Sequence, residues 1–373
     1  MKATDGGRRV IVAGGAGFIG STLVDRLLAM GDEVTVVDNF DPSYPRSRKE
    51  ANLRAASSDP LFRLVEADIR DAGAMGRLFA GTRPDAVVHL AARAGVRPSI
   101  EDPAAYAAVN VLGTVHLLEA ACTLDPRPRF VYASSSSVYG DRPDAPFREA
   151  DPVDRPVSPY AATKRACELM AYTFHHLHGL PVTGLRFFTA YGPRNRPDLA
   201  IARFAALIER GEPVPVFGDG TSRRDYTYVD DIVDGIVRAL ERGTGHHLYN
   251  LGNSDPVGLL RLVEMIGEAL GKTPVIRRMP EQPGDVRQTY ADVGLARSEL
   301  GYRPITPFAE GLARFVEWFR GDIELARSGA GERPRRMTST REGAGPVLPT
   351  PRPNAPASAT GRAHATPGMG HPG

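Results

Sequence analysis

Short apolar runs alternate with longer stretches of helical periodicity through the first half of the chain. The runs predict buried strands, because each is rich in β-branched or other apolar residues and is bounded by polar residues or turn formers. These runs cover residues 10–13, 33–37, 62–67, 86–90, 129–133 and 182–187. The intervening patterns predict helices over residues 18–30, 103–122 and 159–178. Strands and helices that alternate in this way predict an α/β fold, with a doubly wound parallel sheet covered by helices on both faces.

Two of these helices have more apolar surface than one sheet face needs. Residues 103–122 are apolar nearly all round, and residues 159–178 are rich in alanine and other apolar residues. A helix of this kind needs cover on both faces. One side can lie on the sheet, so we expect the other to pack against a second copy of the chain. The pattern therefore predicts a homodimer formed by helices 103–122 and 159–178.

The pattern changes after residue 187. Helices are predicted over residues 199–210, 229–241, 256–270 and 308–320, with short apolar runs between them. We interpret residues 1–187 as the sheet domain, to which some later strands and helices return, and residues 188–325 as a smaller mixed lobe. Residues 326–373 are dominated by Ser, Gly, Pro, Arg, Thr and Ala, which predicts a disordered tail.

Composition narrows the class of protein. Hydrophobic residues make up 42% and charged residues 24% of the 373 residues, as in an ordinary soluble protein. A net charge of +2 gives no argument for nucleic acid or an anionic membrane. No uncharged apolar run reaches the ~20 residues that span a bilayer, and no secretory segment is recognisable. The cysteines, Cys122 and Cys167, are expected to be reduced thiols in a cytoplasmic protein. The cluster His175-His176-x-His178 lacks further ligands at metal spacing, so no metal is predicted.

A glycine-rich turn joins the first strand to the first helix. Gly14, Gly17 and Gly20 allow a tight turn, close approach to a pyrophosphate and close helix packing. The helix that begins at Phe18 and Ile19 then presents its amides to the phosphates. Asp38 ends the second strand, where a carboxylate binds an adenosine ribose and repels the extra phosphate of NADP. This order of elements predicts a Rossmann-type domain that binds NAD, with further contacts from Asp68, Ile69, Ala91 and Ala92.

The candidate chemistry lies between Val131 and Lys164. Ser134 to Ser137 follow a predicted strand, at the edge where such sheets bind ligands. Ser158 and Pro159 are typical of a helix start, which places Tyr160 and Lys164 at i and i+4 on one helix face. An ammonium held near a phenol favours the phenolate, so Tyr160 is a candidate general base.

These motifs resemble the extended short-chain dehydrogenase/reductase family, whose members modify nucleotide sugars. The resemblance covers residues 8–320. Within that family, several stretches are similar to the UDP-glucuronate 4-epimerases in particular. They are Ala94 to Arg97, Ser158 to Lys164, Leu185 to Pro193, and Arg196 to Asp198. The resemblance implies bound NAD, a UDP-sugar substrate and a dimer formed by helix pairs. It implies interconversion of UDP-glucuronate and UDP-galacturonate by transient oxidation at C4.

The resemblance also assigns residues by motif. It implies that Ser135, Tyr160 and Lys164 are catalytic. The implied cofactor site comprises Gly14, Gly17, Phe18, Ile19, Gly20, Asp38, Asn39, Asp68, Ile69, Ala91, Ala92, Asn110, Tyr160, Lys164 and Phe187. The implied substrate site comprises Arg97, Ser136, Ser137, Thr189, Arg196, Phe217, Arg224, Asp285 and Arg287. In that site Thr189 and Arg196 face the sugar carboxylate, Arg224 binds the diphosphate and Asp285 lies near the uridine ribose. Gln282 replaces an arginine of the UDP-galactose 4-epimerases, and Arg287 is the candidate to supply that charge.

Alternatives from the same and other classes stay open. A 4-epimerase of a neutral UDP-sugar, such as UDP-glucose or UDP-N-acetylglucosamine, shares the same catalytic residues, and the Arg196 loop separates the two. Sugar 4,6-dehydratases carry Asp-Glu where this chain has Ser136 and Ser137. UDP-glucuronate decarboxylases usually carry a glutamate in place of Ser137. A non-catalytic NAD-binding sensor is disfavoured, because Ser135, Tyr160 and Lys164 are all present.

Overall fold

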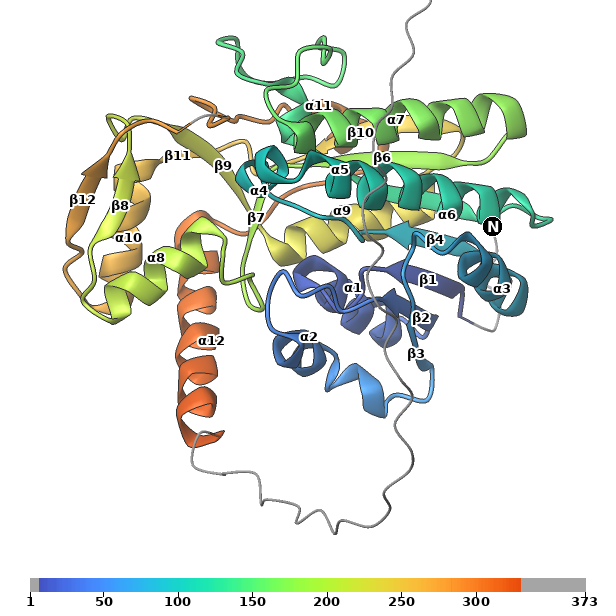
Figure 1. Ribbon diagram of the computed structural model, residues 1–373, viewed down its shortest axis with the longest axis horizontal. Coiled ribbons are helices and arrows are strands. Elements are labelled where there is room, and N and C mark those ends of the chain that lie inside the picture. The colour runs from blue at the N-terminus through green and yellow to red at the C-terminus, as the bar shows by residue number, and fades with distance from the viewer. Residues whose placement is uncertain (1–6, 283, 330–373) are drawn as a thin grey trace, which may run out of the picture. The chain divides into compact units, whose positions relative to one another are not determined.

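A seven-stranded parallel sheet forms the centre of the structure, a computed structural model that describes residues 7–282 and 284–329 (Figure 1). The strand order is β3-β2-β1-β4-β5-β6-β10, and all neighbouring strands are parallel. The bounds are β1 (Arg9–Ala13), β2 (Glu33–Asp38), β3 (Phe62–Glu66), β4 (Ala86–His89), β5 (Arg129–Ser135), β6 (Val182–Phe187) and β10 (His246–Leu251). The order changes direction between β1 and β4, where such sheets bind ligands. The doubly wound α/β fold predicted from the sequence is confirmed.

Both faces of this sheet are buried. Along β1, Val10 and Val12 point to one face and Ile11 and Ala13 to the other, because successive strand side chains alternate. All four side chains are fully buried. Continuous apolar runs such as this one therefore mark strands covered on both sides.

Helices supply that cover on each face (Figure 1). The first face packs against α1 (Phe18–Ala29), α9 (Val229–Arg242) and α11 (Gly294–Glu299). The second face packs against α3 (Ala72–Thr82), α6 (Gly113–Cys122) and α7 (Pro159–His178). Each helix contributes an apolar stripe to the core it covers.

The apolar helix predicted over residues 103–122 is one run in three parts. It comprises α5 (Pro103–Tyr106), the π-helical turn η2 (Ala107–Leu112) and α6. Within the described residues this is one helix whose length and composition suit a membrane span. That match is weak grounds for a membrane, because core helices pass the same test, and here α6 packs between α3 and α7.

A mixed lobe follows β6. One small sheet joins β7 (Thr189–Tyr191), β9 (Arg223–Tyr228) and β11 (Pro256–Gly258), and another joins β8 (Val214–Phe217) and β12 (Ile276–Met279). The lobe has its own apolar core, which includes residues of α8 (Ala200–Glu209), α10 (Leu259–Leu270) and α12 (Phe308–Gly329). The prediction of a helix from residue 256 was wrong by three residues, because Pro256–Gly258 pair with β9.

Other segments were not predicted from the sequence. They include the strand β10 and the helical segments α2 (Arg46–Leu53), η1 (Ala56–Ser58), α3, α4 (Val96–Glu101), η3 (Ser136–Tyr139) and α11. Helix α12 continues to Gly329, so residues 326–329 are helical, in contrast to the predicted tail. The remainder of that predicted tail, residues 330–373, lies outside the described residues.

Candidate active site

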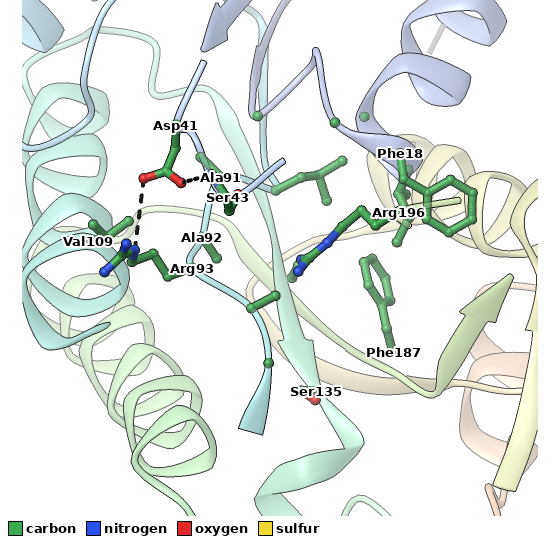
Figure 2. Close-up of a pocket in the computed structure, with 18 of the residues that line it drawn as sticks. Phe18, Asp41, Ser43, Ala91, Ala92, Arg93, Val109, Ser135, Phe187 and Arg196 are labelled. Atoms are coloured by element: carbon green, nitrogen blue, oxygen red, sulfur yellow. Dashed lines mark hydrogen bonds and ion pairs between the residues drawn. The ribbon is translucent and has the colours of Figure 1, made fainter. Parts of the chain in front are cut away.

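A cavity of about 470 Å³ opens at the carboxyl ends of the sheet strands (Figure 2). It brings together most residues predicted to bind cofactor or perform chemistry. These are Gly14, Gly17, Phe18, Ile19, Gly20, Asp38, Asn39, Asp68, Ile69, Ala91, Ala92, Ser135, Ser136, Ser137, Tyr160, Lys164, Phe187, Thr189 and Arg196. Six predicted residues do not line it, namely Arg97, Asn110, Phe217, Arg224, Asp285 and Arg287.

The glycine turn between β1 and α1 forms one end of the cavity. Gly14 has a φ of +83°, and a Cβ there would lie 2.6 Å from the amide nitrogen of Ala91. A Cβ on Gly20 would collide with the carbonyl oxygen of Gly14. Gly17 has more room, and no side chain caps the amides at the start of α1. The turn therefore packs tightly against the sheet and leaves free N–H groups beside the cavity, as a pyrophosphate requires.

A buried acid lies at the end of β2. Asp38 accepts hydrogen bonds from the amides of Phe40 (2.8 Å) and Ala16 (3.2 Å), which ties it to the glycine turn. Nearby, Asn39 donates to Asp68 (3.0 Å). The hydrogen bond from Arg70 lowers the pKa of Asp68 to about 2, so this charged carboxylate can accept a hydrogen bond from a ribose or adenine. Asp38 lines the same cavity.

Sequence reasoning missed Lys49 and Tyr44 in the same wall. The Lys49 ammonium lies 3.6 Å from Asp38 and over the ring of Tyr44, and both residues line the cavity. Burial raises the pKa of Tyr44 to about 12, so this phenol is neutral at pH 7. Residues 46–53 are mostly polar, and a lysine in such a stretch ordinarily lies at the solvent-exposed surface. Nothing in the sequence therefore marked Lys49 as a cavity residue.

The second cavity wall carries the serine run and the start of α7. The strand β5 continues through Ser135, whose Oγ accepts a hydrogen bond from the amide of Ser137 (3.1 Å). Ser158 caps α7 by accepting from the amide of Ala161 (3.2 Å). One helical turn separates Tyr160 from Lys164, and the Lys164 ammonium donates to the carbonyl oxygen of Ala133 (2.8 Å). The structure thus brings a serine hydroxyl, a phenol and an ammonium to one cavity.

Arg196 enters the cavity from a different element. Figure 2 shows its side chain pointing inward from the side that carries Phe18 and Phe187. Two hydrogen bonds join it to Asp198, at 3.0 and 2.6 Å, and they raise the pKa of Arg196 despite the burial that lowers it. Thr189 lies in the same wall. A charged guanidinium in the same cavity as the Ser135 and Tyr160 hydroxyls suits an anionic substrate group.

Arg93 is a second cavity arginine that sequence reasoning did not select. Its guanidinium lies 3.9 Å from Asp41 and 3.1 Å from Asp102 (Figure 2). The Asp41 pair connects the loop after β2 to the loop after β4 on the rim of the cavity. No motif at residue 93 distinguishes it from a surface arginine.

The predicted nucleotide-binding residues form a separate group beyond this cavity. Arg97 pairs with Asp285 (3.1 Å) and lies over the ring of Phe217 (4.9 Å). Arg287 pairs with Asp141 (3.2 Å). These contacts join segments that are far apart in the sequence, among them α4 and β8.

Arg224 is a half-buried cation of that group. Its guanidinium donates to the carbonyl oxygens of Arg223 (2.9 Å) and Arg287 (3.5 Å), and burial lowers its pKa. No carboxylate hydrogen-bonds to it among the described residues. A half-buried guanidinium bonded only to carbonyl groups is suited to an anion such as a diphosphate.

Asn110 is buried behind the cavity wall, not in it. Its amide bonds to the backbone of Arg93 (2.8 and 3.0 Å) and to Thr163 (3.0 Å). Asn110 therefore joins the loop after β4 to α7. In the same region, burial lowers the pKa of His89 to about 3, so this histidine is neutral.

The residues present fit NAD. The glycine turn leaves amides for a pyrophosphate, and Asp38 and Asp68 offer carboxylate oxygens for the adenosine. At the other end, Ser135, Tyr160 and Lys164 lie where a hydroxyl compound meets the nicotinamide in such sheets. The fold and site therefore define a class: an enzyme that uses a dinucleotide to act on a hydroxyl group.

Comparison with known proteins makes this assignment more specific. The model of the NAD dependent epimerase/dehydratase family matches residues 10–252, and the chain belongs to this family. UDP-glucuronate 4-epimerase 4 of Arabidopsis thaliana is 42% identical over 335 residues, which cover 85% of this chain and 76% of that protein. The UDP-glucuronic acid 4-epimerase of Bacillus cereus, solved with UDP-glucuronic acid and NAD, has a TM-score of 0.79 and 33% identity over 84% of this chain and 99% of that chain. The UDP-glucose 4-epimerase of Thermotoga maritima, solved with UDP-glucose, has a TM-score of 0.77 and 35% identity over the same shares, 84% and 99%.

Proposed function

We propose that this protein is a UDP-glucuronate 4-epimerase that interconverts UDP-glucuronate and UDP-galacturonate. One observation carries the proposal: a single cavity joins Ser135, Tyr160 and Lys164 to the guanidinium of Arg196. The first three residues suit chemistry at a sugar hydroxyl, and the cation favours a sugar that bears a carboxylate. The relatives named UDP-glucuronate 4-epimerase support the same substrate.

The chemistry must invert a carbon whose hydrogen is not acidic. Bound NAD would supply an acceptor for the C4 hydride and a donor for its return, so no net oxidant is consumed. Tyr160 accepts the proton of the C4 hydroxyl, and Ser135 holds the same oxygen by a hydrogen bond. Lys164 is held by the carbonyl oxygen of Ala133 and lines the same cavity as the Tyr160 phenol. After the flat 4-keto sugar turns over in the site, Tyr160 gives the proton back.

The uronate adds a second demand. A 4-keto uronic acid is a β-keto acid, which loses carbon dioxide when its carboxylate aligns with the ketone π system. We infer that Ser136, Thr189 and Arg196 hold the carboxylate out of that alignment. All three line the cavity that contains Tyr160.

A 4-epimerase of a neutral UDP-sugar is the second candidate. The observation in its favour is that Asp198 already occupies one edge of the Arg196 guanidinium with two hydrogen bonds. Arg196 is therefore partnered even when the sugar carries no carboxylate. A decarboxylase is disfavoured, because Ser137 stands where such lyases usually carry a glutamate.

One experiment separates these functions. The purified protein is incubated in turn with UDP-glucuronate, UDP-glucose and UDP-N-acetylglucosamine, and the products are identified by NMR. The proposal predicts UDP-galacturonate from UDP-glucuronate, at a rate at least tenfold above that of either neutral sugar. A pentose product would identify the lyase, and faster turnover of a neutral sugar would establish the second candidate. No product from any of the three would contradict an epimerase of these sugars.

We further propose a cytoplasmic homodimer that forms through helices 103–122 and 159–178, with neither nucleic acid nor membrane as a partner. Four large apolar side chains support the dimer, since each is 47–66% exposed on these helices: Leu112, Leu169, Tyr172 and Leu177. NAD and nucleotide sugars are cytoplasmic metabolites, and both cysteines are free thiols. Sedimentation at micromolar concentration tests the dimer: the mass of two chains is expected, and Tyr172→Arg should halve it. A monomeric wild-type mass would contradict this interface.

A further inference from the structure

Helix α7 carries a buried glutamate that the chemistry above does not use. Glu168 is 2% exposed, and its carboxylate accepts hydrogen bonds from Ser134 Oγ (2.6 Å), Arg165 (2.9 Å) and both edge nitrogens of Arg186 (2.8 and 2.9 Å). Burial acts to raise the pKa of Glu168, but these hydrogen bonds outweigh it and hold the pKa below its usual value. The Glu168 carboxylate is therefore charged inside the core. We call it and its partners Ser134, Arg165 and Arg186 the Glu168 junction.

The position of Glu168 on the helix relates it to the catalytic residues. Tyr160, Lys164 and Glu168 occur at i, i+4 and i+8, so they lie along one face of α7. Lys164 donates to the carbonyl oxygen of Ala133, and Glu168 accepts from the hydroxyl of Ser134. The next residue along β5 is Ser135. Two successive residues of the strand are thus fastened to the helix immediately before the catalytic serine.

Arg186 extends the junction to the next strands. It is 1% exposed and lies in β6, directly before Phe187, which lines the cavity. Its Nη1 donates to the hydroxyl of Tyr139 (3.0 Å), and that hydroxyl donates to Asn250 in β10 (2.7 Å). Glu168 therefore joins α7 to β5 directly, and to β6 and β10 through Arg186.

We propose that Glu168 is a positioning residue, which sets the placement of Tyr160 and Lys164 on α7 relative to Ser135 on β5. Apolar side chains of similar volume often stabilise a core as well as a buried ion pair does. Apolar packing has no preferred direction, whereas the hydrogen bonds of Glu168 do, and they fix α7 against β5 in one register. The proposal rests on the proposed C4 oxidation, since proton and hydride leave one carbinol only when Ser135 and Tyr160 reach the same oxygen.

The test uses Glu168→Gln and Ser134→Ala, with Arg165→Gln as the matched control. Arg165 also donates to Glu168, but among the described residues no hydrogen bond joins Arg165 to β5. For each variant, kcat per bound NAD, the KM and the primary isotope effect with the C4-deuterated sugar are measured, using the UDP-sugar that the wild-type protein epimerises fastest. The isotope effect reports how far hydride transfer limits the rate, and a loss of folded protein does not change it.

We expect E168Q to lower kcat per bound NAD about tenfold or more, because a misplacement of ~1 Å can cost a hundredfold. The KM should stay within about threefold, and the isotope effect should rise. S134A should shift the same quantities in the same direction by a smaller factor, and R165Q should leave them unchanged. S134A removes no charge, so it tests the positioning role of Glu168 if E168Q does not fold.

An unchanged isotope effect and an unchanged kcat per bound NAD in S134A would overturn the proposal. So would an effect of R165Q equal to that of S134A, since both remove one hydrogen bond from Glu168. A wild-type protein that epimerises no UDP-sugar would instead overturn the proposed function, and the positioning role with it.

Discussion

The two sides of the proposed substrate site are built in opposite ways. The proposed catalytic side, formed by β5 and α7, holds its charges in the core, where Lys164 and Glu168 are each bonded to the adjacent strand. The proposed nucleotide side has charges that pair at the surface, as Arg97 of α4 does with Asp285. Both partners of that surface pair are about 40% exposed, whereas Glu168 and Arg186 are almost inaccessible.

This difference in burial corresponds to a difference in role: the buried side is suited to the chemical step and the exposed side to substrate recognition. Buried, fully bonded groups hold one geometry, which transfer of a proton and a hydride between fixed atoms requires. Exposed ion pairs contribute little to stability and exchange partners readily. We therefore expect substitutions on the catalytic side to change kcat or stability, and those on the nucleotide side to change mainly KM.

The largest effect is expected for Tyr160→Phe. Loss of the general base should lower kcat by about a thousandfold, within the 10²–10⁴ range that such groups supply. NAD content and the affinity for UDP should stay unchanged, because the ring remains. Turnover followed by NMR, with bound NAD measured after denaturation, checks this. A kcat within tenfold of the wild type would show that the phenol is not the base.

Arg186→Met should give the next largest effect, and it acts on stability. It leaves the buried carboxylate of Glu168 without its main partner, which costs about 3–5 kcal/mol of unfolding free energy. Arg287→Met, which breaks an exposed pair with Asp141, should cost less than about 1 kcal/mol. Urea unfolding of both variants measures the difference. Equal losses would remove the distinction between the two sides.

Arg196→Ala tests an arginine at the boundary between the proposed catalytic side and the proposed nucleotide side. Hydrogen bonds to charged groups contribute about 1.5–3 kcal/mol, so the KM for UDP-glucuronate should rise roughly 10- to 100-fold. The KM for UDP-glucose should stay within about threefold, and decarboxylated by-product should increase. A uronate KM and a by-product level that both match the wild type would exclude Arg196 from carboxylate binding.

Asp285→Asn should have the smallest effect. The exposed pair with Arg97 is lost, which should change the unfolding free energy by less than about 1 kcal/mol. We expect the KM to change a few-fold and kcat not at all, as steady-state kinetics at two salt concentrations will measure. A tenfold fall in kcat would place Asp285 on the catalytic side.

The sheet domain was largely predictable because its strands carry continuous apolar runs. Strand β10 was not predicted, since His246–Leu251 contains two histidines and an asparagine, and α2 was missed because Arg46–Leu53 is mostly polar. In both cases tertiary packing stabilises an element whose local sequence gives a weak signal.

The residues of the site also differ in how well their roles could be predicted from the sequence. Gly14, Tyr160 and Lys164 were predictable because their spacing indicates a mechanism, whereas Ser135 was selected from the serine run by the resemblance to the epimerase family. Glu168 was not, because a glutamate in a helix ordinarily faces water, and only Ser134 and Arg186 from neighbouring strands give it a buried partner. Contacts between segments distant in sequence, such as that of Arg97 in α4 with Asp285, leave no local pattern at all.

In the proposed reaction, the hydrogen removed from C4 returns to the same carbon on its opposite face. Epimerisation of UDP-glucuronate deuterated at C4, in ordinary water, tests this return. We predict that the UDP-galacturonate formed retains the deuterium at C4, as NMR and mass spectrometry will measure. Complete replacement of that label by solvent hydrogen would contradict direct hydride return.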